Sequence, residues 1–158
     1  MALVLRLPTP ADYAALALWV ADAAECLRWA GPDVPFPLDA KTLPRVLHEP
    51  QGARISHVLC QAESPQDPVG FGQCVTKDPG VRHLARIIVR PAARGNGFGR
   101  ALCEQLMAEA VQKGDVNRIT LNVYPDNHNA VALYRALGFI PAEKQPRADM
   151  VLMGKDIR

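Results

Sequence analysis

The chain lacks the features that mark several classes of protein. No apolar run reaches the roughly 20 residues that a membrane-spanning helix needs, and the first residues show no basic segment followed by a long apolar core. Lysine and arginine form no block, and the net charge is only +2, which is too mild to indicate a nucleic-acid-binding protein. We therefore expect no signal peptide, no membrane partner and no nucleic-acid partner.

The four cysteines show no pattern of a metal site. They form no C-x-x-C pair and no metal-like spacing with the histidines. Three of them, Cys60, Cys74 and Cys103, lie within apolar patterns, where cysteine acts as a small hydrophobic residue. These features predict a reduced, cytoplasmic protein that holds no metal.

Two common catalytic signatures are also missing. Neither serine lies in a Gly-x-Ser-x-Gly setting, and no cysteine has a recognisable histidine partner, which disfavours covalent catalysis by a nucleophilic side chain. A nucleoside triphosphatase is disfavoured as well, because no glycine-rich segment ends in Gly-Lys-Ser or Gly-Lys-Thr.

What is present fits one globular domain over residues 1–158, with 49% apolar and 22% charged residues. Apolar patterns predict strands at 2–7, 54–62, 69–76, 82–89, 118–124, 139–144 and 150–155. Helical spacing predicts helices at 10–24, 39–48, 97–113 and 127–137, and the proline-rich segment 29–38 reads as an ordered loop. Because early hairpins precede a strand–helix–strand–helix section, we expect an α/β fold with a mixed rather than a purely parallel sheet.

A glycine-rich turn stands between a predicted strand and a predicted helix. The apolar run Ile87-Ile88-Val89 is followed by Arg94-Gly95-Asn96-Gly97-Phe98-Gly99-Arg100. Such a turn leaves backbone N–H groups without intrahelical partners at the positive end of the helix dipole, and glycine lets phosphate oxygens approach them. With two flanking arginines for charge-assisted bonds, the segment fits a diphosphate, although an ordinary strand-to-helix turn shows the same pattern.

A second block follows in residues 121–139. Together, the two blocks resemble the GCN5-related N-acetyltransferase (GNAT) superfamily, and the resemblance extends over residues 84–141. The family's acetyl-CoA signature, Gln/Arg-x-x-Gly-x-Gly/Ala, is met by Arg94, Gly97 and Gly99. Its later block, Asn-x-x-Ala-x-x-Leu-Tyr-x-x-x-Gly-Phe, is met by Asn127, Ala130, Leu133, Tyr134, Gly138 and Phe139.

The resemblance implies a mostly antiparallel mixed sheet of about six to seven strands with about four helices. Its fourth and fifth strands would splay apart, and acetyl-CoA would enter the gap as co-substrate. The pyrophosphate would lie on the amides of residues 95–100, and the pantetheine arm would pair with the backbone of residues 87–89. Asn127 would hold that arm by its side-chain amide. It is also a predicted helix N-cap, and the two roles use different atoms.

The implied reaction is direct attack of a primary amine on the thioester. Tyr134 resembles the general acid that protonates the departing sulfur. It also shares the apolar face of its helix, where a core aromatic is the alternative, and the resemblance favours the acid role. The base stays open between His83, Asp33 and water. Asn122 stands where some relatives carry a glutamate, and an amide is no base.

The resemblance places the segment between the first two helices at the acceptor pocket. Trp29, Asp33 and Phe36 would lie there, while Trp29 and Phe36 fit a core role equally well. The predicted function is acetyl-CoA-dependent N-acetylation of a small-molecule, peptide or protein amine. The alternative is a non-catalytic acyl-CoA-binding or sensor domain of the same fold. Family members commonly form dimers, so a homodimer is a further expectation.

Overall fold

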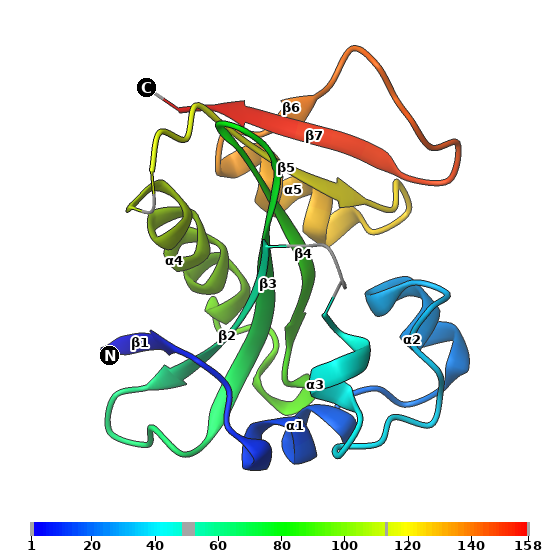
Figure 1. Cartoon of the computed structure of the whole chain (residues 1–158), viewed down its shortest axis with the longest axis vertical. Coiled ribbons are helices and arrows are strands. Elements are labelled where there is room, and N and C mark those ends of the chain that lie inside the picture. The colour runs from blue at the N-terminus through cyan, green and yellow to red at the C-terminus, as the bar shows by residue number, and fades with distance from the viewer. Residues whose placement is uncertain (1, 49–52, 113, 158) are drawn as a thin grey trace.

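The computed structural model describes residues 2–48, 53–112 and 114–157, and its strands form one seven-stranded sheet in the order β1-β2-β3-β4-β5-β7-β6 (Figure 1). The strands are β1 (Leu3–Arg6), β2 (Ala53–Gln61), β3 (Pro68–Asp78), β4 (Val81–Val89), β5 (Arg118–Val123), β6 (Ile140–Pro141) and β7 (Val151–Asp156). The helices are α1 (Pro10–Ala17), α2 (Ala23–Ala30), α3 (Leu43–Val46), α4 (Phe98–Gln112) and α5 (His128–Ala136), with a short 3₁₀ turn, η1 (Pro91–Ala93).

Neighbouring strands pair antiparallel except at the centre of the sheet. There β4 and β5 run parallel, and their pairing extends only from Val81–Arg118 to Leu84–Leu121. Beyond that point the two strands diverge (Figure 1). The predicted mixed α/β sheet with a splay between its fourth and fifth strands is therefore confirmed.

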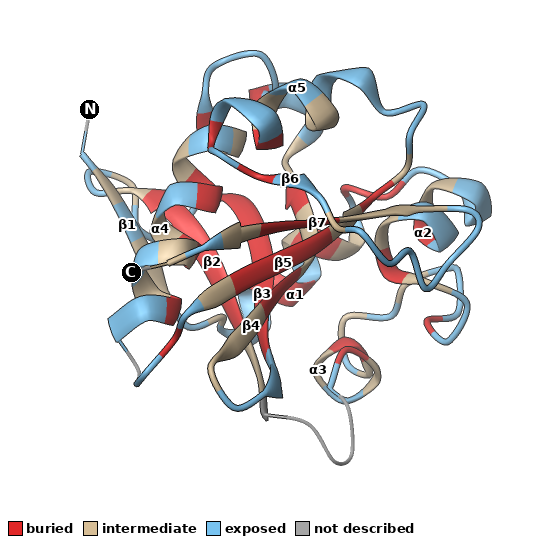
Figure 2. Ribbon diagram, turned by 90° about the horizontal axis from the view of Figure 1, so that it is seen from above, coloured by how far each residue is buried: buried red, intermediate tan, exposed pale blue. Residues whose placement is uncertain are grey.

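Helices cover both faces of the sheet and divide the core into two clusters. On one face α4 and α5 bury residues such as Leu102, Leu106 and Tyr134 against the central strands. On the other face α1, α2 and α3 pack around Phe71 and Ile88. Figure 2 shows the buried residues concentrated in the central strands, while the outward sides of the helices are exposed. Within the described residues, no helix has the length and apolar character required to cross a bilayer.

The first predicted helix, residues 10–24, is in fact two helices. Asp22 has an extended backbone, and its side chain accepts a hydrogen bond from the Glu25 N–H at 2.8 Å, so a new helix begins at this cap. The apolar stripe that predicted one helix runs from α1 into the following turn. As a consequence Trp29 lies on α2, not in the predicted loop, and the described helices number five rather than about four.

Other elements are present but shorter than predicted. The helix expected at 39–48 is reduced to Leu43–Val46, and the strand expected at 139–144 is reduced to Ile140–Pro141. Pro141 has no N–H to contribute to a ladder, which limits that strand. The predicted helix over 97–113 is found as Phe98–Gln112; its predicted end, Lys113, lies outside the described residues.

Candidate active site

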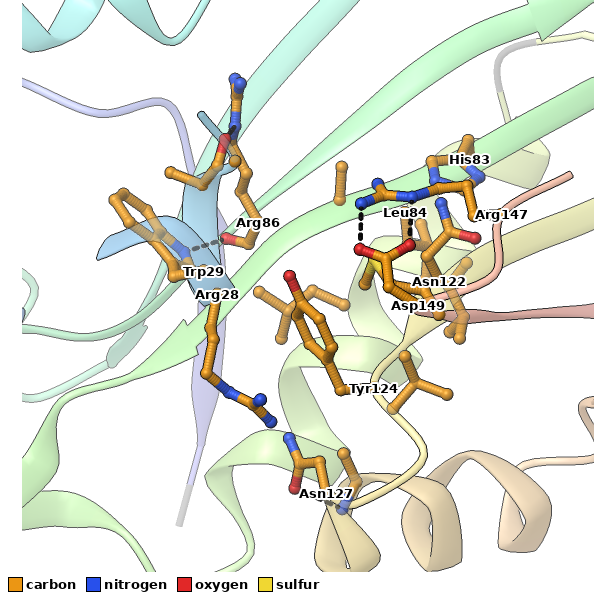
Figure 3. Close-up of a pocket in the computed structure, with 18 of the residues that line it drawn as sticks. Arg28, Trp29, His83, Leu84, Arg86, Asn122, Tyr124, Asn127, Arg147 and Asp149 are labelled. Atoms are coloured by element: carbon orange, nitrogen blue, oxygen red, sulfur yellow. Dashed lines mark hydrogen bonds and ion pairs between the residues drawn. The ribbon is translucent and has the colours of Figure 1, made fainter. Parts of the chain in front are cut away.

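A cavity of about 470 Å³ lies where β4 and β5 diverge (Figure 3). Its walls come from residues 83–87 of β4, from residues 121–124 of β5 and its exit, and from residues 27–32 at the end of α2. The loop between β6 and β7 closes another side with Arg147, Asp149 and Met150. The splay therefore produces a site that elements distant in the sequence share.

A β-bulge in β4 forms part of the cavity wall. Pairing with β3 shifts register between Ala85 and Ile88, and Arg86 there adopts φ 50°, which is uncommon for a residue with a side chain. The Trp29 indole N–H donates to the Arg86 carbonyl at 2.8 Å. The Arg86 guanidinium in turn donates to the carbonyls of Ala30 (3.1 Å) and Leu47 (2.9 Å). The bulge and the C-terminal ends of α2 and α3 are thus fixed to one another.

The glycine turn leaves a row of backbone donors without backbone acceptors. In the described part of the chain, no backbone N–H of residues 95–100 donates to a main-chain carbonyl, and the first such bond of α4 runs from Ala101 to Gly97. Gly95 and Gly97 have φ of 80° and 82°, and a Cβ on either would meet no atom within 4 Å. The surface above the turn is therefore open, and its donors fit a diphosphate.

The two arginines of this turn are held loosely, whereas the Asn96 side-chain amide donates to the carbonyls of Ala93 (3.0 Å) and Arg94 (3.2 Å). The Arg94 Nε–H donates to the Val89 carbonyl at 3.1 Å, and its guanidinium lies 3.9 Å from the Glu25 carboxylate. Arg100 lies 3.6 Å from Glu104. Both arginines are about half exposed, so these ion pairs contribute little and leave the guanidinium groups available to an incoming anion.

Asn127 is the N-cap of α5, as predicted. Its side-chain oxygen accepts a hydrogen bond from the Ala130 N–H at 3.3 Å. The side-chain nitrogen points in the opposite direction, toward the cavity (Figure 3). The oxygen can therefore cap α5 while the nitrogen remains available to donate a hydrogen bond to a molecule in the cavity.

Tyr134 is both a core residue and part of the cavity wall. Its side chain is 8% exposed, and its ring packs edge-on against Phe139 with 6.2 Å between centroids. Desolvation, with a smaller contribution from Cys103, raises the pKa of the phenol above its usual value. The hydroxyl therefore retains its proton at neutral pH.

The candidate proton acceptors lie in different places. His83 is buried, lines the cavity, and has its Nδ1 atom 2.7 Å from the Thr120 hydroxyl. If Nδ1 donates its hydrogen to Thr120, the lone pair of the neutral ring lies on Nε2. Asp33 is exposed and lies outside the cavity lining. Asn122 lines the cavity.

The structure gathers only some of the predicted site residues at the cavity. Trp29, His83, Ile87, Asn127 and Tyr134 line it, whereas Asp33 and Phe36 do not. Ile88 points into the cluster on the α1–α3 face of the sheet. Val89 and the glycine turn continue beyond the cavity along β4 and into α4.

Several cavity residues were missed by sequence reasoning. The Arg28 guanidinium lies 4.2 Å from the ring centroid of Tyr124 and pairs with Asp126 at 2.7 Å. Arg147 and Asp149 form a two-bond ion pair beside Asn122 and His83 (Figure 3). These residues lie at α2, at the exit of β5 and in the β6–β7 loop, and no local motif connects them. The Asp22-x-x-Glu25 cap was a signal that would have placed Arg28 and Trp29 on a helix.

No metal site accompanies this arrangement in the described ranges. There, no three side chains of histidine, cysteine, aspartate or glutamate lie close enough together to hold an ion.

Comparisons with known proteins agree with this architecture. A model of the acetyltransferase (GNAT) family matches residues 18–139. An N-acetyltransferase 9-like protein of Nematostella vectensis is 35% identical over 65 residues, a match that covers 39% of this chain and 33% of that relative. The chain thus spans about a third of that relative's length.

Solved structures share the fold over nearly the whole chain. Aminoglycoside acetyltransferase AAC(6')-Ib in complex with ribostamycin and coenzyme A superposes with a TM-score of 0.77 at 24% identity, covering 99% of this chain and 94% of that one. Spermidine N-acetyltransferase of Vibrio cholerae, in complex with CoA and spermine, gives 0.76 at 20% identity, covering 98% and 95%. The family match includes the splayed strands, the glycine turn and α5. The chain therefore belongs to the acetyltransferase (GNAT) family.

Proposed function

We propose that this protein is an acetyl-CoA-dependent N-acetyltransferase that acts by direct attack of a primary amine on the thioester. One observation carries the proposal. The β4–β5 ladder ends at Leu84 and Leu121, and the gap beyond it opens a cavity beside a turn of unpaired backbone donors. An extended arm with a diphosphate at one end matches that combination.

The binding roles follow from the groups available. We assign the diphosphate to the amides of residues 95–100, with support from Arg94 and Arg100. The arm would pair with the main chain of residues 87–89, as an added strand does. The Asn127 side-chain nitrogen, which its capping bond leaves free to face the cavity, would donate to the same arm.

Acetyl-CoA supplies an acetyl group as a thioester, and its transfer forms a C–N bond, breaks a C–S bond and requires one proton to leave the nitrogen and one to reach the sulfur. We assign the sulfur's proton to Tyr134, whose phenol stays protonated at the cavity wall. His83 is our candidate to accept the amine's proton, directly or through water. Main-chain N–H groups near Val89 would polarise the carbonyl.

The domain organisation, the class of acceptor and the location of the protein are part of the same proposal. Residues 1–158 would form one acetyltransferase domain, since the sheet takes strands from Leu3 to Asp156. A small-molecule amine is supported by the fold neighbours with ribostamycin or spermine bound. The four cysteines are buried and none is in a disulfide, in keeping with the predicted cytoplasmic location. A homodimer stays a prediction.

The experiment combines coenzyme A binding by calorimetry with thiol release over a panel of amines. We expect Tyr134→Phe to bind coenzyme A like the wild type and to lose about 10²- to 10⁴-fold in kcat, the usual contribution of a positioned acid. Tyr13→Phe is the matched control, because Tyr13 is also buried but lies in the cluster on the α1–α3 face.

Three results would count against the proposal. Absence of coenzyme A binding would overturn the whole assignment. Tight binding without turnover of any amine would favour the sensor domain, and an unchanged kcat in Tyr134→Phe would remove the acid role alone.

A further inference from the structure

The charged side chains around the cavity are mostly of one sign. Its lining includes five basic residues, namely Arg28, Arg54, Lys77, Arg86 and Arg147. Among the described lining residues the only carboxylate is that of Asp149. A polycationic acceptor needs carboxylates around it, and this wall offers the opposite charge.

The single carboxylate is already engaged. The Arg147 Nε–H donates to Asp149 Oδ1 at 3.0 Å and an Nη–H donates to Oδ2 at 2.8 Å, so both oxygens accept from one guanidinium. Figure 3 shows this pair over Asn122 and beside His83, on the side of the cavity opposite α2. Asp149 is thus not set to attract a second cation.

The basic side chains approach the cavity from separate walls. Arg28 comes from α2, Lys77 from β3 and Arg147 from the β6–β7 loop. Clefts that are lined by one sign of charge focus the field and raise the local concentration of the opposite charge. A positive field also lowers the pKa of a bound ammonium group, which favours the neutral amine that the reaction needs.

We infer that the acceptor amine carries an anionic oxygen group, a carboxylate or a phosphate, on the same molecule, and that Lys77 and Arg147 recognise it. This inference rests on the proposed N-acetyltransferase function and names the class of its substrate.

These two residues are chosen because the others have structural contacts. Arg28 bridges to Asp126 and Tyr124, Arg54 donates to the side-chain oxygen of Gln73 at 2.9 Å, and Arg86 holds the ends of α2 and α3. Arg147 pairs within its own loop, and with side chains 48% and 56% exposed that pair contributes little to stability. Asp149 accepts from only two of the five N–H groups of this guanidinium, so the others can bind a carboxylate or phosphate of the acceptor while the pair stays intact. Lys77 is exposed at the cavity rim.

The test compares acceptors with and without the anionic group. We would measure kcat/KM for leucine and leucinamide, for β-alanine and β-alaninamide, and for phosphoethanolamine and ethanolamine, with spermidine and kanamycin as polycations. We expect the anionic member of at least one pair to be preferred by about 10-fold or more, the scale of one charge-assisted contact. The pair that shows it distinguishes carboxylate from phosphate.

Substitutions test whether Lys77 and Arg147 cause the preference for the anionic acceptor. Lys77→Gln and Arg147→Gln are expected to lower kcat/KM for the anionic acceptor about 10-fold each and to leave its neutral partner unchanged. Lys41→Gln and Arg135→Gln are matched controls, because both residues are exposed and lie outside the cavity lining. Equal or better use of the neutral or polycationic amines would overturn the inference while leaving the proposed function intact.

A binding measurement tests recognition of the anionic group independently of turnover. Calorimetry with N-acetylleucine against N-acetylleucinamide, and with O-phosphoethanolamine against ethanolamine, is done on the wild type in the presence of coenzyme A. We expect tighter binding of the anionic member, lost in Arg147→Gln. Equal binding, or no binding by any of the four compounds, would overturn the inference. Preferential anion binding without turnover would instead count against the proposed function alone.

Discussion

Gly97 and Gly99 are two residues apart, yet the structure gives them different tasks. Gly97 has φ 82°, a left-handed backbone conformation that is strained for residues with a side chain. A Cβ at Gly99 would lie 3.7 Å from atoms of Leu133 and Val89, which is ordinary van der Waals contact. Only the first position depends on glycine for its conformation.

The pair therefore provides a matched test of the turn. Gly97→Ala is expected to cost about 1–2 kcal/mol in backbone strain, to place a methyl group over the turn and to weaken coenzyme A binding at least 10-fold. Gly99→Ala, inside a helix where alanine is favoured by about 1 kcal/mol, is expected to keep binding within about 3-fold. Calorimetry and thermal unfolding measure both, and equal losses in the two variants would contradict the assignment of the diphosphate to this turn.

Residue-scale prediction succeeded where a short motif defines the position. Asn127 was predicted as an N-cap and is one, because a cap depends on only four consecutive residues. Arg28, Tyr124 and the Arg147–Asp149 pair were missed, since their significance arises from contacts between distant segments. No spacing along the chain encodes that proximity.

Among the elements, α2 departs most from the sequence prediction and bears most on the site. It begins at the Asp22 cap and carries Arg28 and Trp29 to the cavity. The strands were predicted well because period-2 and continuous apolar patterns are strong signals. The break between α1 and α2 was missed because the apolar residues Leu16, Trp19 and Val20 continue across the end of α1 and are all buried.

The start of α2 yields a prediction of its own. Asp22→Ala removes the acceptor of the Glu25 N–H bond and should lower the free energy of unfolding by about 1 kcal/mol. Asp22→Asn retains a capping oxygen and should lose clearly less. Urea unfolding measures both variants. If the alanine and asparagine variants proved equally stable, the cap would not be what begins this helix.

At the scale of the whole molecule, the sheet separates two buried clusters, one on the α4–α5 face and one on the α1–α3 face. The cluster under α1–α3 is tied to β1 through Arg6 and Asp12, where an Nη–H of Arg6 donates to Asp12 Oδ1 at 3.0 Å and the Thr9 N–H donates to Oδ2 at 2.7 Å. Burial acts to raise the pKa of the Asp12 carboxyl, but these hydrogen bonds outweigh it and hold the pKa below its usual value.

This shift makes stability depend on pH in a defined direction. A carboxyl whose pKa is lower in the folded state stabilises the fold above its unfolded pKa, about 3.9, and loses that contribution as the pH falls toward the folded value. Urea midpoints measured between pH 7 and pH 3 should therefore fall more steeply for the wild type than for Asp12→Asn. Asp156→Asn is the control, because Asp156 is 84% exposed in its pair with Arg118. Parallel curves for wild type and Asp12→Asn would contradict this role.

The overall topology was predictable because it rests on the order of elements and on a family resemblance covering the second half of the chain. The exact composition of the cavity was not. The first 50 residues supply Arg28 and Trp29, and their segment is the part in which the resemblance was weakest. Charge around the cavity depends on how three separate walls come together, which is a property of the folded chain alone.

The early end of the β4–β5 ladder, after Leu84 and Leu121, has a consequence for how this sequence can change over time. Beyond this point the edge of β4 exposes unpaired backbone groups to the gap, and backbone groups do not depend on the identity of the side chain. Exchange of one aliphatic residue for another along residues 87–89 therefore leaves the backbone donors and acceptors intact. Such substitutions should have little effect on binding of the arm. Proline is unsuitable there because it deletes a donor, and Ile88 is buried, so we expect natural variation along residues 87–89 to range over aliphatic side chains and to exclude proline.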